Sequence, residues 1–125
     1  MAIISKKFWK NRRVLITGHT GFKGSWLLLC LLEMGADVWG VSLEADPEPN
    51  LFRYLNPSIE GKFKHLEENI LNKNSLKKFV NECQPEIVFH LAAQALVQRS
   101  YLDPVLTWET NVMGTLNLLE SLKIL

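Results

Sequence analysis

Four short segments along the chain, three of them apolar runs, predict β-strands. They cover residues 14–16, 38–41, 62–66 and 87–93, of which the third is the weakest and the last the strongest. The last run is apolar apart from His90, and strands this apolar are usually covered on both faces of a sheet. We interpret His90 as a core histidine with satisfied hydrogen bonds rather than as a catalyst.

Amphipathic stretches between these runs predict helices. Residues 23–34 stop at Gly35, which favours a helix end. A second helix follows the capping residue Asn72, with apolar positions at helical spacing: Leu76, Phe79, Val80 and Cys83. Cys30 and Cys83 lie on apolar helix faces and are expected to be small core residues. Residues 45–59 contain three prolines and Asn50, so we expect mostly loop there.

A last helix opens at Asp103-Pro104, a capping residue followed by proline at the first helical position. Its apolar residues form one stripe at helical spacing: Val105, Trp108, Val112, Leu116, Leu119 and Leu122.

The alternation of strands and helices predicts an α/β fold with a Rossmann-type, doubly wound parallel sheet and helices on both faces. Right-handed crossovers place the four strands in the order 3-2-1-4, which is a partial sheet of this class. The 125 residues suit one domain, and 47% of them are apolar, which is enough for a core.

Composition narrows the possible functions. Fourteen basic and thirteen acidic residues give a formal charge of +1, which argues against nucleic-acid binding. No apolar run approaches the ~18 residues of a membrane span, and the first ten residues lack the apolar core of a secretion signal. No His, Cys or carboxylate cluster has metal-ligand spacing. The two cysteines form no motif and suggest a reducing compartment, hence the cytoplasm.

A glycine-rich segment, residues 17–24, joins the first strand to the first helix. Its glycines follow the pattern G-x-x-G-x-x-G at Gly18, Gly21 and Gly24. We expect Gly18 to allow the sharp turn, Gly21 to let a pyrophosphate approach the backbone, and Gly24 to let the helix pack closely. Free N–H groups at the helix start favour an anion. The segment therefore predicts nucleotide binding, with a plain tight turn as the alternative.

The end of the second strand bears on which dinucleotide is bound. Rossmann proteins place an acidic residue there to hold the adenosine ribose, and this chain offers Ser42 and, two residues on, Glu44. No arginine follows the strand to receive a 2′-phosphate. We therefore expect NAD rather than NADP.

Three segments carry a family resemblance. Residues 17–26 (TGHTGFKGSW), 85–101 (PEIVFHLAAQALVQRSY) and 103–120 resemble the CDP-glucose 4,6-dehydratases. These belong to the sugar-nucleotide epimerases and dehydratases of the extended short-chain dehydrogenase/reductase superfamily.

The resemblance implies roles for particular residues. Those implied to bind the cofactor are the loop residues Gly18, His19, Thr20, Gly21, Phe22, Lys23 and Gly24, then Ser42 and Glu44, then Asn69 and Ile70 beside the adenine, and Leu91, Ala92, Ala93 and Gln94 under the ribose and nicotinamide. Asn69 stands where the family usually has an Asp. Asn111 is implied to support the catalytic network, and Ser100 and Tyr101 to begin the substrate pocket. For His19, a loop residue without a cofactor contact is an equally good interpretation.

The implied activity is an NAD-dependent lyase reaction that converts CDP-glucose to CDP-4-keto-6-deoxyglucose, in deoxysugar and polysaccharide biosynthesis. The family's Tyr-x-x-x-Lys pair is absent, because Tyr54 is followed four residues on by Ser58 and Tyr101 by Val105. We therefore expect residues 1–125 to be the N-terminal portion of an NAD-binding domain, inactive by itself. The alternatives are a GDP-mannose or dTDP-glucose dehydratase, a UDP-sugar epimerase, or a non-catalytic nucleotide-binding module.

The predicted topology also bears on association. In the order 3-2-1-4 the fourth strand has an unpaired apolar edge, which is a template for pairing with another chain. The stripe of the last helix resembles the dimer helix of the superfamily, and a large exposed apolar patch normally marks an interface. We expect a homo-oligomer, most simply a dimer.

Overall fold

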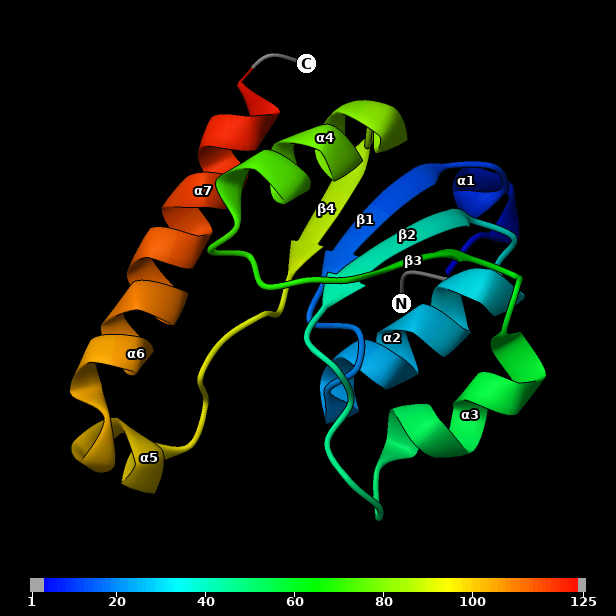
Figure 1. Cartoon of the computed structure of the whole chain (residues 1–125). Helices are drawn as coiled ribbons and strands as arrows, with labels where there is room; N and C mark the ends of the chain where they lie inside the picture. The colour runs from blue at the N-terminus through cyan, green and yellow to red at the C-terminus, as the bar shows by residue number, and fades with distance from the viewer. Residues whose placement is uncertain (1–3, 124–125) are drawn as a thin grey trace.

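The computed structural model describes residues 4–123 and contains a four-stranded parallel sheet (Figure 1). The strands are β1 (Arg13–Thr17), β2 (Asp37–Ser42), β3 (Lys64–Glu67) and β4 (Ile87–His90). Their order is β3-β2-β1-β4, which confirms the predicted order. β1 is central, with Thr17 opposite Val41 on one side and His90 on the other.

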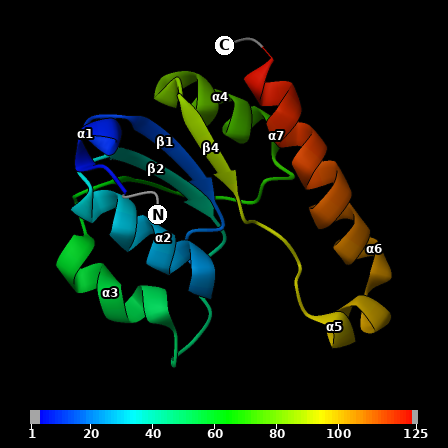
Figure 2. The ribbon, with the colours of Figure 1, turned by 180° about the vertical axis from the view of Figure 1, so that it is seen from behind.

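Helices cover both faces of the sheet (Figures 1 and 2). The helical segments are α1 (Lys6–Trp9), α2 (Phe22–Glu33), α3 (Leu51–Ile59), α4 (Lys73–Cys83), α5 (Val97–Leu102), α6 (Pro104–Trp108), the π-helical turn η1 (Glu109–Met113) and α7 (Gly114–Leu122). One core cluster joins α2 and α3 to the sheet through Val14, Ile16 and Phe52. A second joins α4 and α7 to the opposite face, around Leu15 and Leu76. No helix of residues 4–123 is both long and apolar enough to cross a membrane.

The expectation of a loop over residues 45–59 is wrong for its second half, which forms α3. The Asn50 side chain caps this helix by accepting a hydrogen bond from the N–H of Arg53, at 3.1 Å. Phe52 and Ile59 are buried against the sheet. Pro57 lies in the second half of this nine-residue helix, where it removes one backbone hydrogen bond. Capping and tertiary burial thus outweigh the helix-breaking tendency of the sequence.

The fourth strand is shorter than predicted and ends at His90. β1 stops at Thr17, so the chain beyond His90 has no neighbouring strand to pair with. Leu91 still donates its N–H to the carbonyl of Thr17, at 2.9 Å, and the chain then leaves the sheet. The four residues of β4 are half-buried rather than covered on both faces, because the strand lies at an edge of the sheet.

The last helical stretch is continuous through α6, η1 and α7 and forms one side of the molecule (Figure 1). Its α7 part packs against α4, and Gly114, Asn117, Leu118 and Ser121 of α7 are buried. The predicted apolar stripe faces away from the sheet: Val105, Trp108, Val112, Leu116 and Leu119 are all exposed. Cys83 is buried as expected, but Cys30 is exposed, because it lies on the outer side of α2.

Candidate functional site

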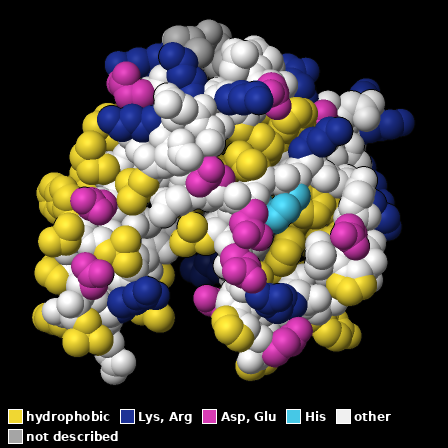
Figure 3. All heavy atoms as spheres, in the orientation of Figure 1, with side chains coloured by type: hydrophobic (Ala, Val, Ile, Leu, Met, Phe, Trp, Pro, Cys, Tyr) yellow, Lys and Arg dark blue, Asp and Glu magenta, His cyan; other side chains and the backbone are white. Residues whose placement is uncertain are grey.

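The carboxyl ends of the parallel strands bring four loops to one edge of the sheet. The strands end at Thr17, Ser42, Glu67 and His90, and ligands of open α/β sheets bind outside this edge. In the space-filling view the surface is hollowed there, between the α5–α6 side and the α3 side (Figure 3). Most residues expected to bind the cofactor therefore lie along one edge.

Two glycines of the first loop are required by the fold itself. Gly18 has φ +81°, and a Cβ on it would lie 2.7 Å from the backbone nitrogen of Ala92. A Cβ on Gly24 would collide with the carbonyl oxygen of Gly18 and lie 2.8 Å from the Cα of His19. Gly18 thus makes the turn and touches the loop after β4, and Gly24 brings α2 against the loop.

Gly21 is different, because no contact within residues 4–123 requires a glycine there. Its backbone is extended (φ −75°, ψ 171°), and a Cβ would meet only the carbonyl oxygen of Gly18, at 3.4 Å. Gly21 is the N-cap of α2 and has no side chain that could accept a hydrogen bond, so the first N–H groups of this helix receive no cap from it. The open space and these N–H groups fit an anion such as a pyrophosphate.

His19 points inward, away from the loop surface. Its side chain is fully buried, and its Nε2 forms a hydrogen bond with Nδ1 of His65, at 2.7 Å. Edge-to-face contacts with Phe52 and Phe63 enclose the ring. Burial, together with His65, lowers the pKa of His19 to about 3, so the ring is neutral. The whole residue is buried beneath the loop surface, and its imidazole is a core group.

Thr20 ties the glycine loop to the end of β2. Its hydroxyl donates to the carbonyl oxygen of Leu43, at 3.0 Å, and so receives the hydroxyl proton of Ser42 across 2.6 Å. Both Thr20 and Ser42 are buried. Phe22 and Lys23, the first residues of α2, are exposed.

Arg53 of α3 is a residue that the sequence analysis missed at this edge. Its Nε–H donates to the carbonyl oxygen of Asp46, at 2.7 Å, and its Nη2 to that of Ala45, at 2.6 Å. The same Nη2 forms an ion pair with Glu44, at 3.4 Å. The only available signal was the Asn50 cap, which starts the helix that carries Arg53.

The loop after β3 is shaped by local hydrogen bonds. The Asn69 side-chain oxygen accepts the N–H of Leu71, at 2.9 Å, which leaves its amide N–H groups uncommitted. Ile70 is buried, and a Cβ on Gly114 of α7 would collide with its side chain. Asn117 donates to the carbonyl oxygen of Ile70, at 3.1 Å. Ile70 therefore joins this loop to the core, and Asn69 is the polar group left at the edge.

His90 connects β1 to the last helical stretch through a chain of hydrogen bonds. Thr17 accepts the N–H groups of Leu91 and Ala92, both at 3.1 Å, and donates to Nδ1 of His90 at 2.5 Å. The hydroxyl of Thr115 donates to the carbonyl of Asn111, at 2.7 Å, so Nε2–H of His90 donates to Thr115 across 2.8 Å. These roles need a neutral imidazole, and burial lowers the pKa of His90 accordingly. The histidine is satisfied within the protein, as expected from the sequence.

Asn111 holds the loop after β4. Its Oδ1 accepts the N–H of Gln94, at 2.8 Å, and its Nδ2 donates to the Gln94 carbonyl, at 3.1 Å. The Gln94 amide in turn bonds to Leu96 and Thr107. Leu91 and Ala93 are exposed on this loop and Ala92 is half-buried, so the four residues line the edge as a braced segment.

Ser100 and Tyr101 lie apart from the glycine loop. Both belong to α5, and Tyr101 is 84% exposed. Figure 1 shows α5 below the sheet, at the end of the segment that leaves β4. Within residues 4–123, no group of three His, Cys, Asp or Glu side chains is placed to hold a metal ion.

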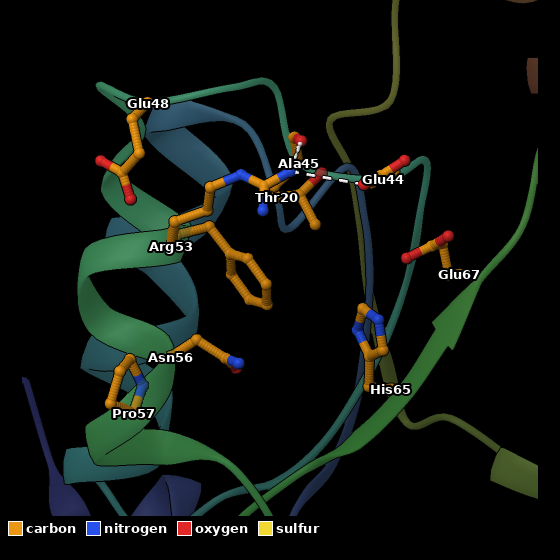
Figure 4. Close-up of a pocket in the computed structure, with 10 residues that line it drawn as sticks. Thr20, Glu44, Ala45, Glu48, Arg53, Asn56, Pro57, His65 and Glu67 are labelled. Atoms are coloured by element: carbon orange, nitrogen blue, oxygen red, sulfur yellow. Dashed lines mark hydrogen bonds and ion pairs between the residues drawn. The ribbon is translucent and has the colours of Figure 1, made fainter.

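A cavity of about 440 Å³ adjoins the glycine loop and lies between α3 and β3 (Figure 4). Its lining residues are Thr20, Glu44, Ala45, Glu48, Phe52, Arg53, Asn56, Pro57, His65 and Glu67. The His65 ring stacks on Phe52 with centroids 5.9 Å apart. Burial lowers the pKa of His65, while Glu67 acts in the opposite direction.

The parallel sheet in the order 3-2-1-4, with a glycine loop between its central strand and the following helix, defines a Rossmann-type protein. Residues 15–125 match the model of the GDP-mannose 4,6 dehydratase family, and the chain belongs to that family.

Individual relatives agree with this assignment. The chain is 50% identical to the CDP-glucose 4,6-dehydratase of Salmonella typhimurium over 97% of its length, which is 33% of that protein. This confirms the resemblance seen in the sequence.

Solved structures give the same fold. An epimerase from Methanothermobacter thermautotrophicus aligns with a TM-score of 0.81 and 30% identity, over 95% of this chain and 34% of that one. The UDP-glucose 4-epimerase of Thermus thermophilus in complex with NAD aligns with a TM-score of 0.74 and 33% identity, over 86% of this chain and 32% of that one. The chain thus spans about a third of the length of the relatives it matches.

Proposed function

We propose that this chain binds NAD along the carboxyl edge of its sheet and is the cofactor-binding part of a nucleotide-sugar 4,6-dehydratase acting on CDP-glucose. The observation that supports this most strongly is the 50% identity to a CDP-glucose 4,6-dehydratase across nearly the whole chain. The reaction class would be a lyase.

The residues at the edge fit a dinucleotide. The pyrophosphate lies against Gly21 and the first N–H groups of α2, where no side chain intrudes. Glu44, which is exposed, faces the adenosine ribose, while Ser42 is buried and supports the site through its hydrogen bond with Thr20. Asn69 offers an amide to the adenine. Residues 91–94 lie beneath the nicotinamide half. When bound, NAD supplies the capacity to accept a hydride from the sugar and return it.

The proposal also assigns cofactor binding and catalysis to different parts of the protein. Neither Tyr54 nor Tyr101 is followed four residues on by a lysine, so we assign residues 1–125 to the N-terminal portion of the NAD-binding domain. The acid/base pair and the nucleotide-sugar domain belong to other residues of the protein. Asn111 supports the site by holding Gln94 in place, and Ser100 and Tyr101 are assigned to the substrate side.

The test is an assay of the protein with four substrates: CDP-glucose, GDP-mannose, dTDP-glucose and UDP-glucose, each with NAD. We expect a 4-keto-6-deoxy product from CDP-glucose alone. A product from GDP-mannose or dTDP-glucose but not from CDP-glucose would contradict the substrate and leave the reaction class standing. Interconversion of UDP-glucose and UDP-galactose would instead support an epimerase.

Self-association is proposed on two features. β4 has no partner on its outer side among the described strands, and the last helical stretch exposes five large apolar residues. Burying such a face between two copies is the simplest way to remove it from water. Both cysteines are free, in keeping with a reducing compartment, which we take to be the cytoplasm.

A further inference from the structure

The cavity between α3 and β3 is continuous with the proposed NAD site. Thr20 of the glycine loop and Glu44 after β2 both line it. In the proposed binding mode Glu44 faces the adenosine ribose, so the cavity that Glu44 lines adjoins the 2′-oxygen of that ribose. The 2′-phosphate of NADP would then lie close to the charges of this cavity, whereas NAD carries only a neutral hydroxyl there.

Charges in the cavity are unbalanced. Its lining contains the three carboxylates Glu44, Glu48 and Glu67 and a single guanidinium, that of Arg53. Burial lowers the pKa of His65, which disfavours a positive charge on this ring. Figure 3 shows acidic side chains gathered beside a histidine on this face of the molecule.

Two of the three nitrogens of the guanidinium are already engaged. Arg53 uses its Nε and Nη2 groups on two backbone carbonyls of the loop after β2 and pairs with Glu44. Figure 4 shows its side chain extended across the top of the cavity toward Ala45 and Glu44. A phosphate that left these contacts in place would find only the Nη1 group of Arg53, so this side chain mainly shapes the loop and offers no bidentate phosphate site.

We propose that this cavity discriminates against NADP by electrostatic repulsion, with Glu48 and Glu67 as specificity-determining residues and Arg53 as the residue that positions Glu44. The inference rests on the proposed NAD binding. The sequence has no arginine directly after the second strand. The fold does place an arginine at this position, and discrimination arises from carboxylates that come from separate elements.

The size of the repulsion between a 2′-phosphate and one carboxylate follows from Coulomb's law. A phosphate with about two negative charges, some 6 Å from one carboxylate in a water-like medium, is disfavoured by about tenfold in affinity. The repulsion is screened by salt, because the Debye length falls from about 10 Å at 0.1 M to about 3 Å at 1 M. Steric exclusion would not respond to salt.

The experiment compares the dissociation constants of NAD and NADP, measured by calorimetric titration of the protein at low and high salt. Glu67→Gln and Glu48→Gln should each lower the preference for NAD by about tenfold at low salt through tighter NADP binding, with NAD affinity unchanged. Glu60→Gln is the matched control, because Glu60 is exposed and does not line the cavity. High salt should reduce the preference for NAD over NADP in wild type, and it should reduce that preference less in the two Gln variants.

The possible outcomes distinguish a failure of this inference from a failure of the proposed NAD binding. Binding of NAD and NADP with equal affinity in wild type would overturn this inference and leave the proposed function intact. An unchanged preference in both Gln variants would also overturn it, as would a preference that is insensitive to salt. Failure of wild type to bind either dinucleotide would overturn the proposed function and this inference with it.

Discussion

Replacing Gly21 by valine should separate cofactor binding from folding. The backbone at Gly21 is extended, a conformation that suits valine, and the nearest atom to a new Cβ is the Gly18 carbonyl oxygen at 3.4 Å. A non-glycine residue restricts the unfolded chain, which favours folding, but valine is a poor N-cap, which costs a similar amount. We expect the free energy of unfolding to change by less than about 1 kcal/mol.

The effect on binding should be much larger. The valine methyl groups would occupy the open space in front of the first N–H groups of α2, where the proposed pyrophosphate lies. Losing one charged hydrogen bond costs about 1.5–3 kcal/mol, so the dissociation constant for NAD should rise at least about tenfold. Calorimetric titration measures the affinity, and thermal denaturation of the same samples measures the stability.

Gly24→Ala is the contrasting control. Its Cβ would meet the backbone of Gly18 and His19, so the helix must shift and stability should fall by about 1–3 kcal/mol. A Gly21→Val protein that is folded and binds NAD as tightly as wild type would refute the assignment of this loop to the pyrophosphate.

Three further predictions concern a buried histidine, a loop clamp and the apolar face. Because the pKa of His19 falls from 6.5 to about 3 on folding, the unfolded chain binds a proton that the folded chain does not. The free energy of unfolding should therefore fall as the pH drops through this window, by at most about 1.4 kcal/mol per pH unit, and His19→Gln should flatten the slope in denaturant titrations. Asn111→Ala removes both hydrogen bonds to Gln94, which should cost about 1 kcal/mol and speed exchange of the Gln94 amide; unchanged exchange would show that the loop is held otherwise. Leu116→Glu, on the exposed face, should lower the molar mass measured by light scattering toward that of the monomer without unfolding the chain. Leu118→Glu should unfold the chain, because Leu118 is only 2% exposed. An unchanged mass for a folded Leu116→Glu protein would place the interface elsewhere.

Local pattern was enough to predict much of the framework. The strand order, the helix after Asn72 and the turn at Gly35 follow from spacing, capping and the handedness of crossovers, which are properties of neighbouring residues. The glycine loop was visible for the same reason, since its neighbours along the chain are a strand and a helix.

Segments whose conformation depends on distant partners were predicted less well. α3 forms despite Pro57 because Phe52 finds a place against the sheet. β4 ends at His90 because β1 offers no partner beyond Thr17. Sequence reasoning left the role of His19 open, and burial beside His65, from another strand, makes its imidazole a core group.

The sequence by itself determined the class of sheet, the position of the glycine loop and the family resemblance, because each depends on residues close together along the chain. Tertiary structure alone decided which charges meet at the proposed ribose end of the site. Arg53 reaches the loop after β2 from α3, and Glu67 faces the same cavity from β3. Electrostatic energy depends on distance through space, and only the folded sheet and helix set those distances.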